Sequence, residues 1–213
     1  MKTDKKNSHP SKAGSGVYRK GKEKKELILK EAINLFSLVG PSEFSVRSLA
    51  NRLGTKTSSI QHYFPSRTDL MCAIVEYYQE LRKPYEDDFF ELTFSNDVER
   101  LDAYINFILK SQIRSGIYIY YALLAEAVTS TPELIKSIKK GFSDHLNRAC
   151  GILEPLTPQL TKEQRMNRAV FIVSAADGLK PFEPSNPDIM PDVGKHQLMS
   201  DAHTYLRQIA LMP

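Results

Sequence analysis

The sequence predicts an all-α protein in which a small N-terminal unit of three helices is joined to a larger helical domain. Apolar residues recur at spacings of three and four over most of the 213 residues, as on the buried face of amphipathic helices. Glycine and proline residues interrupt these patterns and mark the ends of helices. No pair of segments shows the alternation of apolar and polar residues that paired strands need.

Residues 1–22 mix Lys, Ser, Gly, Asn and Pro with almost no large apolar side chain. Such a segment cannot bury enough surface to offset the entropy that ordering it would cost. We therefore expect a flexible basic arm over 1–22, followed by a first helix over about 24–39. This helix should end at Gly40 and Pro41, because glycine favours a left-handed C-cap and proline does not continue a helix.

Two short helices should follow, joined by a glycine turn. Ser45 is placed to cap the first of them by accepting a hydrogen bond from a first-turn amide, and Gly54 is suited to the positive φ of the turn. The next helix is expected over 56–63, with Ile60 and Phe64 as its apolar contacts. Two short helices across a tight glycine turn form a helix-turn-helix. Because such short helices are marginal alone, they must pack in one compact unit.

This helix-turn-helix unit is expected to span residues 23–68, and residues 69–213 are expected to form the larger helical domain. A long connecting helix should begin at Ser66 and run to about Leu81, before Pro84. Further helices are predicted at 85–94, 97–114, 117–129, 132–153, 162–179 and 195–211. The four prolines from Pro181 to Pro191 predict a loop between the last two helices.

The net charge of +4 conceals an uneven distribution of charge along the chain. Residues 1–70 contain 14 Lys and Arg against 6 Asp and Glu, whereas the remaining residues contain 15 against 19. A local excess of positive charge attracts polyanions through long-range forces and counterion release. This favours nucleic acid as a partner; the alternative is that residues 2–25 are only a solubilising tail.

A helix-turn-helix binds DNA because its second helix fits the major groove, while basic and hydroxyl side chains beside it bind phosphates. Ile60 and Phe64 define the buried side of the helix over 56–63, so the opposite side faces outward. The residues expected to face base edges are Thr57, Ser58, Gln61 and His62. The residues expected to bind phosphates are Lys56, Ser59, Tyr63, Arg47 and Arg67. The alternative is a three-helix unit that only packs, with Tyr63 stapling helices together.

The same region resembles the DNA-binding domain of the TetR (tetracycline-repressor-like) family over about residues 24–72. Gly54 to Leu70 is similar to the family's glycine turn, recognition helix, aromatic pair and Ser-Lys/Arg-acidic-Leu ending. Two positions depart from the family: Lys56 stands where a small capping residue is usual, and Gln61 where tyrosine is usual. The residues that carry the resemblance are Leu29, Ala32, Leu35, Phe36, Gly40, Ser45, Val46, Leu49, Ala50, Gly54, Ser59, Ile60, Tyr63, Phe64, Ser66, Asp69 and Leu70.

The resemblance implies a transcription regulator, most commonly a ligand-responsive repressor that binds a palindromic operator as a homodimer and is released by a small effector. It implies that the effector binds between helices of the larger domain. The aromatic residues of that domain suit an apolar or aromatic effector, although core packing is the alternative for most of them. The candidate effector contacts are Tyr78, Phe107, Gln112, Tyr121, Glu126, His145 and Phe171.

The resemblance further implies that the last two helices, at about 162–179 and 195–211, form the homodimer interface. Small and apolar residues on both helices suit a four-helix bundle with a twofold mate. The alternative is a helix pair that packs within one chain. In the dimer, the two recognition helices would lie about one turn of DNA apart, or a small multiple of one turn.

Other classes of protein find little support in the sequence. The motifs G-x-S-x-G, G-x-x-x-x-G-K and H-E-x-x-H are absent and there is no Cys-His cluster, so we expect no catalysis, no metal and no cofactor. The remaining alternative is a helical ligand-binding or adaptor protein that has lost DNA binding, and the unusual Gln61 is the reason to consider it. Cys72 and Cys150 fit buried thiols of a cytoplasmic protein, and no apolar run is long enough to span a membrane.

Overall fold

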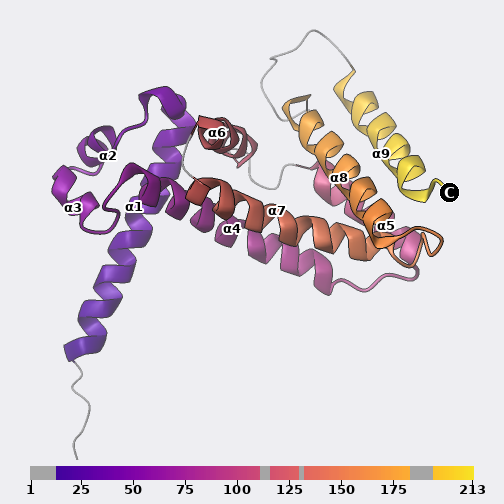
Figure 1. Ribbon diagram of the computed structural model, residues 1–213, viewed down its shortest axis with the longest axis horizontal. Helices are drawn as coiled ribbons and strands as arrows, with labels where there is room; N and C mark the ends of the chain where they lie inside the picture. The colour runs from indigo at the N-terminus through magenta and orange to yellow at the C-terminus, as the bar shows by residue number, and fades with distance from the viewer. Residues whose placement is uncertain (1–12, 111–115, 130–131, 183–193) are drawn as a thin grey trace, which may run out of the picture. The chain divides into compact units, whose positions relative to one another are not determined.

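The computed structural model of the protein describes residues 13–110, 116–129, 132–182 and 194–213 (Figure 1). Every regular element within these ranges is a helix, as predicted. The chain divides into two compact units, Met1–Arg67 and Thr68–Pro213, one residue before the boundary expected after residue 68. No described helix is both long enough and apolar enough to cross a membrane.

Helix α1 (Ala13–Glu43) is longer at both ends than the predicted helix over 24–39. Its helical geometry is interrupted at Gly40, which has a φ of 72°. The prediction of a flexible arm is wrong for residues 13–22, which are helical, while residues 1–12 lie outside the described part. That prediction weighed only buried apolar surface. Alanine, lysine and arginine favour helix intrinsically, and Arg19 Nε lies 3.4 Å from Glu23 Oε1 one turn later.

Helix α2 (Val46–Arg52) begins at the predicted cap. The Ser45 hydroxyl accepts a hydrogen bond from the amide of Ser48 at 3.0 Å, and the Ser48 hydroxyl accepts one from the amide of Ser45. Gly54 has a φ of 60°, as the predicted turn requires, and leads into α3 (Thr57–Gln61). Helix α3 is shorter than the predicted 56–63 because Lys56 and His62 are its caps, and Lys56 gives it no side-chain cap hydrogen bond.

The three helices of the first unit enclose a small apolar core. Each contributes at least one fully buried side chain, such as Ile28 from α1, Leu49 from α2 and Ile60 from α3. Phe36 and Phe44 meet edge to face with ring centroids 5.1 Å apart. This core fixes the turn between α2 and α3 and thereby leaves the polar side of α3 outside.

Helix α4 (Arg67–Glu91) is a single helix of 25 residues, whereas the sequence predicted a break at Pro84 and a separate helix over 85–94. A proline inside a helix removes one backbone hydrogen bond, to the carbonyl four residues earlier, and crowds that carbonyl. Here both Pro84 and Glu80 are exposed, so water can solvate the freed carbonyl. Buried residues on both sides of the proline, Tyr78 and Phe89, keep the helix packed.

The described part of the second unit contains five further helices. They are α5 (Asp97–Leu109), α6 (Gly116–Thr129), α7 (Pro132–Leu153), α8 (Lys162–Leu179) and α9 (Lys195–Leu211), with a short 3-10 turn, η1 (Lys180–Phe182), after α8. The bounds of α7, α8 and α9 are those predicted. Helix α5 ends before the predicted residue 114, and most of the predicted loop over 181–191 lies outside the described residues.

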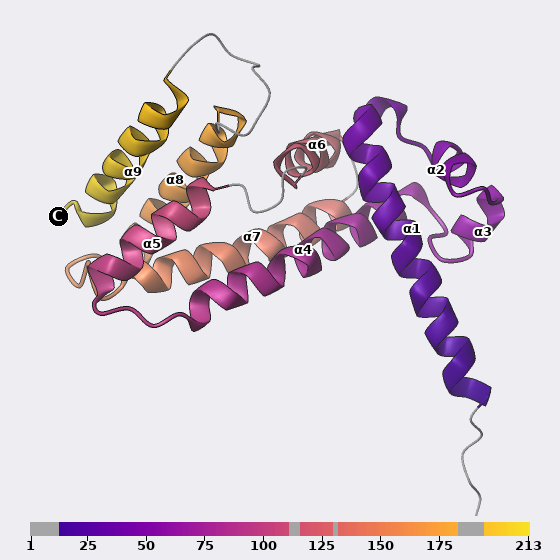
Figure 2. The ribbon, with the colours of Figure 1, turned by 180° about the vertical axis from the view of Figure 1, so that it is seen from behind.

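Within this unit, α4 and α7 run side by side in both ribbon views (Figures 1 and 2). The Gln79 side chain of α4 donates a hydrogen bond from Nε2 to the carbonyl of Ser137 on α7 at 3.2 Å. Helices α5, α8 and α9 pack on one another around a core that includes Tyr104, Ile172 and Leu206.

Candidate nucleic-acid interface and effector pocket

The outer side of α3 carries the residues predicted to read bases. Ser58, Gln61 and His62 are exposed, and Thr57 is half-buried, whereas Ile60 and Phe64 are buried as predicted. The ring of Tyr63 packs edge to face on that of His62, with centroids 5.1 Å apart. The helix-turn-helix thus presents hydroxyl, amide and imidazole groups on one side, which is the chemistry that base edges require.

All five residues predicted to bind phosphates are at least partly exposed, but one of them, Arg67, is engaged within the protein. Arg47 and Lys56 are exposed, and Ser59 and Tyr63 are half-buried. Arg67 instead makes contacts within its own unit. Its Nη1 donates to the carbonyl of Phe44 at 2.6 Å, and its guanidinium lies 5.6 Å from the centre of the Phe44 ring. Arg67 therefore holds the first residue of α4 to the segment between α1 and α2, and its phosphate contact stays a prediction.

Two other basic residues of the first unit have contacts that the sequence did not reveal. Arg52 Nε donates to Glu31 Oε2 at 2.8 Å, which joins α2 to α1, and this hydrogen bond holds the pKa of the Glu31 carboxyl below its usual range. Lys25 Nζ lies 5.5 Å from the centre of the Phe64 ring, just after α3. Lys25 thus places a positive charge beside the end of the recognition helix.

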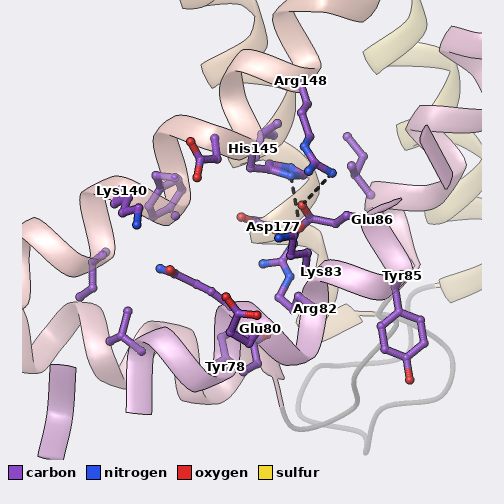
Figure 3. Close-up of a pocket in the computed structure, with 18 of the residues that line it drawn as sticks. Tyr78, Glu80, Arg82, Lys83, Tyr85, Glu86, Lys140, His145, Arg148 and Asp177 are labelled. Carbon is purple, nitrogen blue, oxygen red and sulfur yellow. Dashed lines mark ion pairs between the residues drawn. The ribbon is translucent and has the colours of Figure 1, made fainter. Parts of the chain in front are cut away.

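The second unit contains a cavity of about 310 Å³ between α4, α5, α6, α7 and α8. Its apolar walls include Tyr78, Phe107 and Val173. Ten of the lining residues are charged, and Figure 3 shows most of these around the open centre of the pocket. The charged lining residues are Glu80, Arg82, Lys83, Glu86, Lys110, Lys140, Asp144, Arg148, Asp177 and Lys180.

A partly buried charge cluster surrounds Glu86, whose side chain is 16% exposed. Its carboxylate lies 3.0 Å from Arg82 Nη2, 3.7 Å from His145 Nδ1 and 3.8 Å from Arg148 Nη1. Burial by itself would raise the pKa of Glu86, but His145 and the two guanidinium groups outweigh it and hold the pKa below its usual range. Glu86 is therefore ionised at neutral pH.

His145 links three helices of this unit. Its Nδ1 faces Glu86 on α4, and its Nε2 lies 3.4 Å from the hydroxyl oxygen of Tyr104 on α5. Burial raises the pKa of Tyr104, so its hydroxyl stays protonated and can donate to Nε2. His145 Nδ1 and Arg148 Nη1 are both buried and have no hydrogen-bond partner among the described residues. The cluster thus contains polar groups that a bound molecule or water could satisfy.

The predicted effector contacts divide into two groups. Tyr78, Phe107 and His145 line the pocket. Glu126, Tyr121 and Phe171 lie outside its lining, and Tyr121 and Phe171 are 37% and 56% exposed; Gln112 lies outside the described residues.

Sequence reasoning did not single out the charged residues of the pocket. Arg82 and Glu86 lie four residues apart on α4, a spacing typical of an exposed helical ion pair. They also flank Pro84, where the sequence predicted the helix to end. The apolar spacing that continues from Tyr78 to Phe89 is the signal that indicates one helix across Pro84, and thereby places Arg82 and Glu86 within it.

Comparisons with known proteins identify the first unit. Residues 28–74 match the family model described as bacterial regulatory proteins, tetR family. No curated protein sequence matches the chain.

Solved structures match over most of the chain. A putative transcriptional regulator from Saccharomonospora viridis, in complex with choline, is 17% identical with a TM-score of 0.70, and the match covers 87% of this chain and 96% of that one. A putative TetR-family transcriptional regulator from Rhodococcus sp. is 15% identical with a TM-score of 0.67, covering 88% and 97%. AibR, in complex with isovaleryl coenzyme A and operator DNA, is 17% identical with a TM-score of 0.66, covering 85% and 97%.

These structures share the all-helical fold with this chain. The first two are described as putative transcriptional regulators, and AibR is described in complex with operator DNA. The matched family model covers α1 from Ile28, the whole helix-turn-helix of α2 and α3, and the start of α4. The helix-turn-helix unit of this chain therefore matches the tetR family of bacterial regulatory proteins, and the chain as a whole shares the helical fold of these solved structures.

Proposed function

We propose that this protein is a ligand-responsive repressor that binds a palindromic operator as a homodimer and is released by a small effector. The observation that carries the proposal is the course of α4. This helix begins at Arg67, which binds the carbonyl of Phe44 in the first unit, and its later turns line the pocket from Val75 to Glu86. One continuous helix thus joins the unit that binds DNA to the cavity that would bind the effector.

The DNA contacts follow from the outer side of α3. Gln61 can pair with adenine through its amide, and Thr57, Ser58 and His62 can hydrogen-bond to neighbouring base edges. Arg47 and Lys56 supply charges for phosphates on either side, which set the register of the helix without reading sequence.

A homodimer is supported by the exposed faces of α8 and α9. Between Asn167 and Gly178 the exposed residues of α8 are uncharged, and so are those of α9 between His196 and Gln208, in a chain of which 25% of residues are charged. Phe171 and Tyr205 are 56% and 60% exposed on these faces. Core regions of protein interfaces are depleted in charge and enriched in aromatic residues, so a twofold mate would bury this surface.

The pocket favours an effector with an apolar or aromatic body and an acidic group. Tyr78, Phe107 and Val173 would contact the body. The lining has six basic and four acidic side chains, although residues 68–213 as a whole have 15 Lys and Arg against 20 Asp and Glu. His145 Nδ1 and Arg148 Nη1 are also buried without a hydrogen-bond partner among the described residues, with the Glu86 carboxylate 3.7 and 3.8 Å away. Choline and isovaleryl coenzyme A, bound by two structural relatives, differ widely in chemistry, so the fold alone does not choose the effector.

The proposed release acts through α4. An effector that contacts Tyr78, Arg82 and Glu86 would shift this helix, and Arg67 would pass the shift to the segment that precedes α2. In a homodimer, a small shift of this kind changes the separation of the two recognition helices and weakens binding to a site of fixed spacing.

Selection of bound DNA from a random pool tests the proposal, followed by release of that DNA with candidate ligands. The proposal expects a palindromic sequence and affinity that falls steeply with salt. Arg47→Gln should weaken binding to this sequence and reduce its salt dependence. An affinity for DNA that does not depend on salt and that Arg47→Gln leaves unchanged would contradict operator binding. Activation of a reporter gene, instead of its repression, would contradict the assignment as a repressor.

A further inference from the structure

The first turns of α1 form a helical extension that the core of the unit does not require. Among the described side chains of α1, the first buried one is Ile28, so Arg19 to Leu27 contribute no buried residue to the core. From Ala13 to Leu27 the extension is about 22 Å long at the usual rise per residue. In Figures 1 and 2 these turns continue past α3.

This extension is strongly basic where its side chains are described. Between Arg19 and Leu27 it has five basic residues against two acidic ones, and Arg19 is 79% exposed. Like charges on neighbouring turns repel one another, and a short helix without buried contacts is marginal in water. A partner with negative charge would relieve the repulsion and stabilise the helix.

Helical spacing places part of this charge on the side of α1 that carries the helix-turn-helix. Leu29, Ala32 and Phe36 form the buried face, and Lys22 and Lys25 continue it toward the N-terminus at spacings of three and four residues. The contact of Lys25 Nζ with the Phe64 ring fixes this direction, because Phe64 lies three residues after the end of α3 at Gln61. Lys22 lies one turn further toward the N-terminus on the same side of α1.

We propose that the α1 extension, with Arg19, Lys20 and Lys22, is a second phosphate-binding element that grips the DNA backbone beside the major groove occupied by α3. The inference rests on DNA binding by this protein. The partners assigned to the extension are phosphates rather than bases, because the charged ends of its exposed lysine and arginine side chains reach the DNA backbone before the base edges. Contacts with phosphates carry no sequence information.

The test compares three proteins on one DNA sequence enriched from a random pool and on a scrambled duplex. The first is wild type, and the second is Arg19→Gln/Lys20→Gln/Lys22→Gln. The third is Lys136→Gln/Lys139→Gln/Lys162→Gln, which removes the same charge from exposed sites on the second unit. Affinity is measured by fluorescence anisotropy over a range of salt concentrations, and circular dichroism checks that the variants stay folded.

For the Arg19/Lys20/Lys22 variant, the slope of log affinity against log salt should become less steep by about 0.9 for each phosphate that the extension no longer neutralises. At about 0.1 M salt, the removal of two such phosphate interactions corresponds to an affinity roughly 60-fold lower by the same relation. The ratio of affinities for the enriched and scrambled duplexes should stay the same, and the control variant should behave as wild type.

A slope equal to that of wild type, or an equal change in the control variant, would overturn the inference while leaving operator binding intact. A change in the affinity ratio would also overturn it, because the extension would then read sequence. If wild type itself selects no sequence and binds without salt dependence, the proposed repressor function fails instead. Tighter binding of the extension to anionic lipid vesicles than to either duplex would replace DNA with a membrane as its partner.

Discussion

Replacing Glu86 by glutamine tests the charge cluster of the pocket, because it removes the charge and keeps the shape. The carboxylate has three positively charged or titratable neighbours within 3.8 Å and is 16% exposed. Breaking a fully buried pair costs roughly 3–5 kcal/mol and an exposed pair up to about 1 kcal/mol. For this partly buried site we expect Glu86→Gln to lower the free energy of unfolding by about 1–2 kcal/mol at about pH 7.

The pH dependence of this difference has a definite sign. The folded protein lowers the pKa of Glu86 below the ordinary value of 4.5, mainly because His145, Arg82 and Arg148 outweigh the effect of burial. Its contribution to stability is therefore fully present above pH 4.5 and is lost as the pH falls through the folded pKa. The gap between wild type and Glu86→Gln should shrink on acidification below pH 4.5.

Urea unfolding followed by far-UV circular dichroism, at one fixed protein concentration, measures the difference. Hydrogen exchange at amides of α4 and α7 locates it within the second unit. Glu76→Gln is the matched control, since Glu76 is exposed on the same helix and does not line the pocket. Equal stability of the two variants at neutral pH, or a gap that widens on acidification below pH 4.5, would refute the reasoning.

Three further predictions concern the cap, the dimer and the effector. Ser45→Ala should destabilise the first unit by about 1 kcal/mol, measured by hydrogen exchange in α2, because it removes the cap hydrogen bond to Ser48; unchanged exchange would contradict this. Phe171→Asp should shift the protein toward monomer in light scattering, whereas Leu38→Asp, which changes an exposed residue of α1, should not. Calorimetry should show that 4-phenylbutyrate binds about tenfold more tightly than its amide or amine analogue. Lys140→Gln, at a residue that lines the pocket, should weaken binding of 4-phenylbutyrate, and Lys139→Gln, at a residue outside the lining, should not. Tighter binding of the amine would contradict an acidic effector.

The local features of the helix-turn-helix could be predicted because each depends on one residue and its neighbours. Ser45 caps α2 and Gly54 adopts a positive φ, as expected from their chemistry alone. The buried side of α3 also follows from the spacing of Ile60 and Phe64. Such rules act within a few residues, so the sequence displays them directly.

The features that the sequence did not predict correctly depend on contacts between residues that are far apart in the sequence. Pro84 predicts a helix end, but packing of Tyr78 and Phe89 on either side outweighs the missing hydrogen bond. The pocket is similar, because Glu86 meets His145 and Arg148 only when α4 and α7 lie side by side. Helical spacing predicts which residues share a face of one helix, and it does not predict which helix that face meets.

The central claim is that α3 reads the base sequence of DNA, and Gln61 tests it most directly. Wild type and Gln61→Ala should be put through the same selection from a random DNA pool at the same salt concentration. We expect wild type to enrich a palindrome, and Gln61→Ala to lose discrimination at one base pair of each half-site, by about 1–3 kcal/mol, with its affinity for scrambled DNA unchanged. Identical enriched sequences and affinities for the two proteins would contradict base reading by Gln61, and the absence of any enriched sequence with wild type would contradict the claim as a whole.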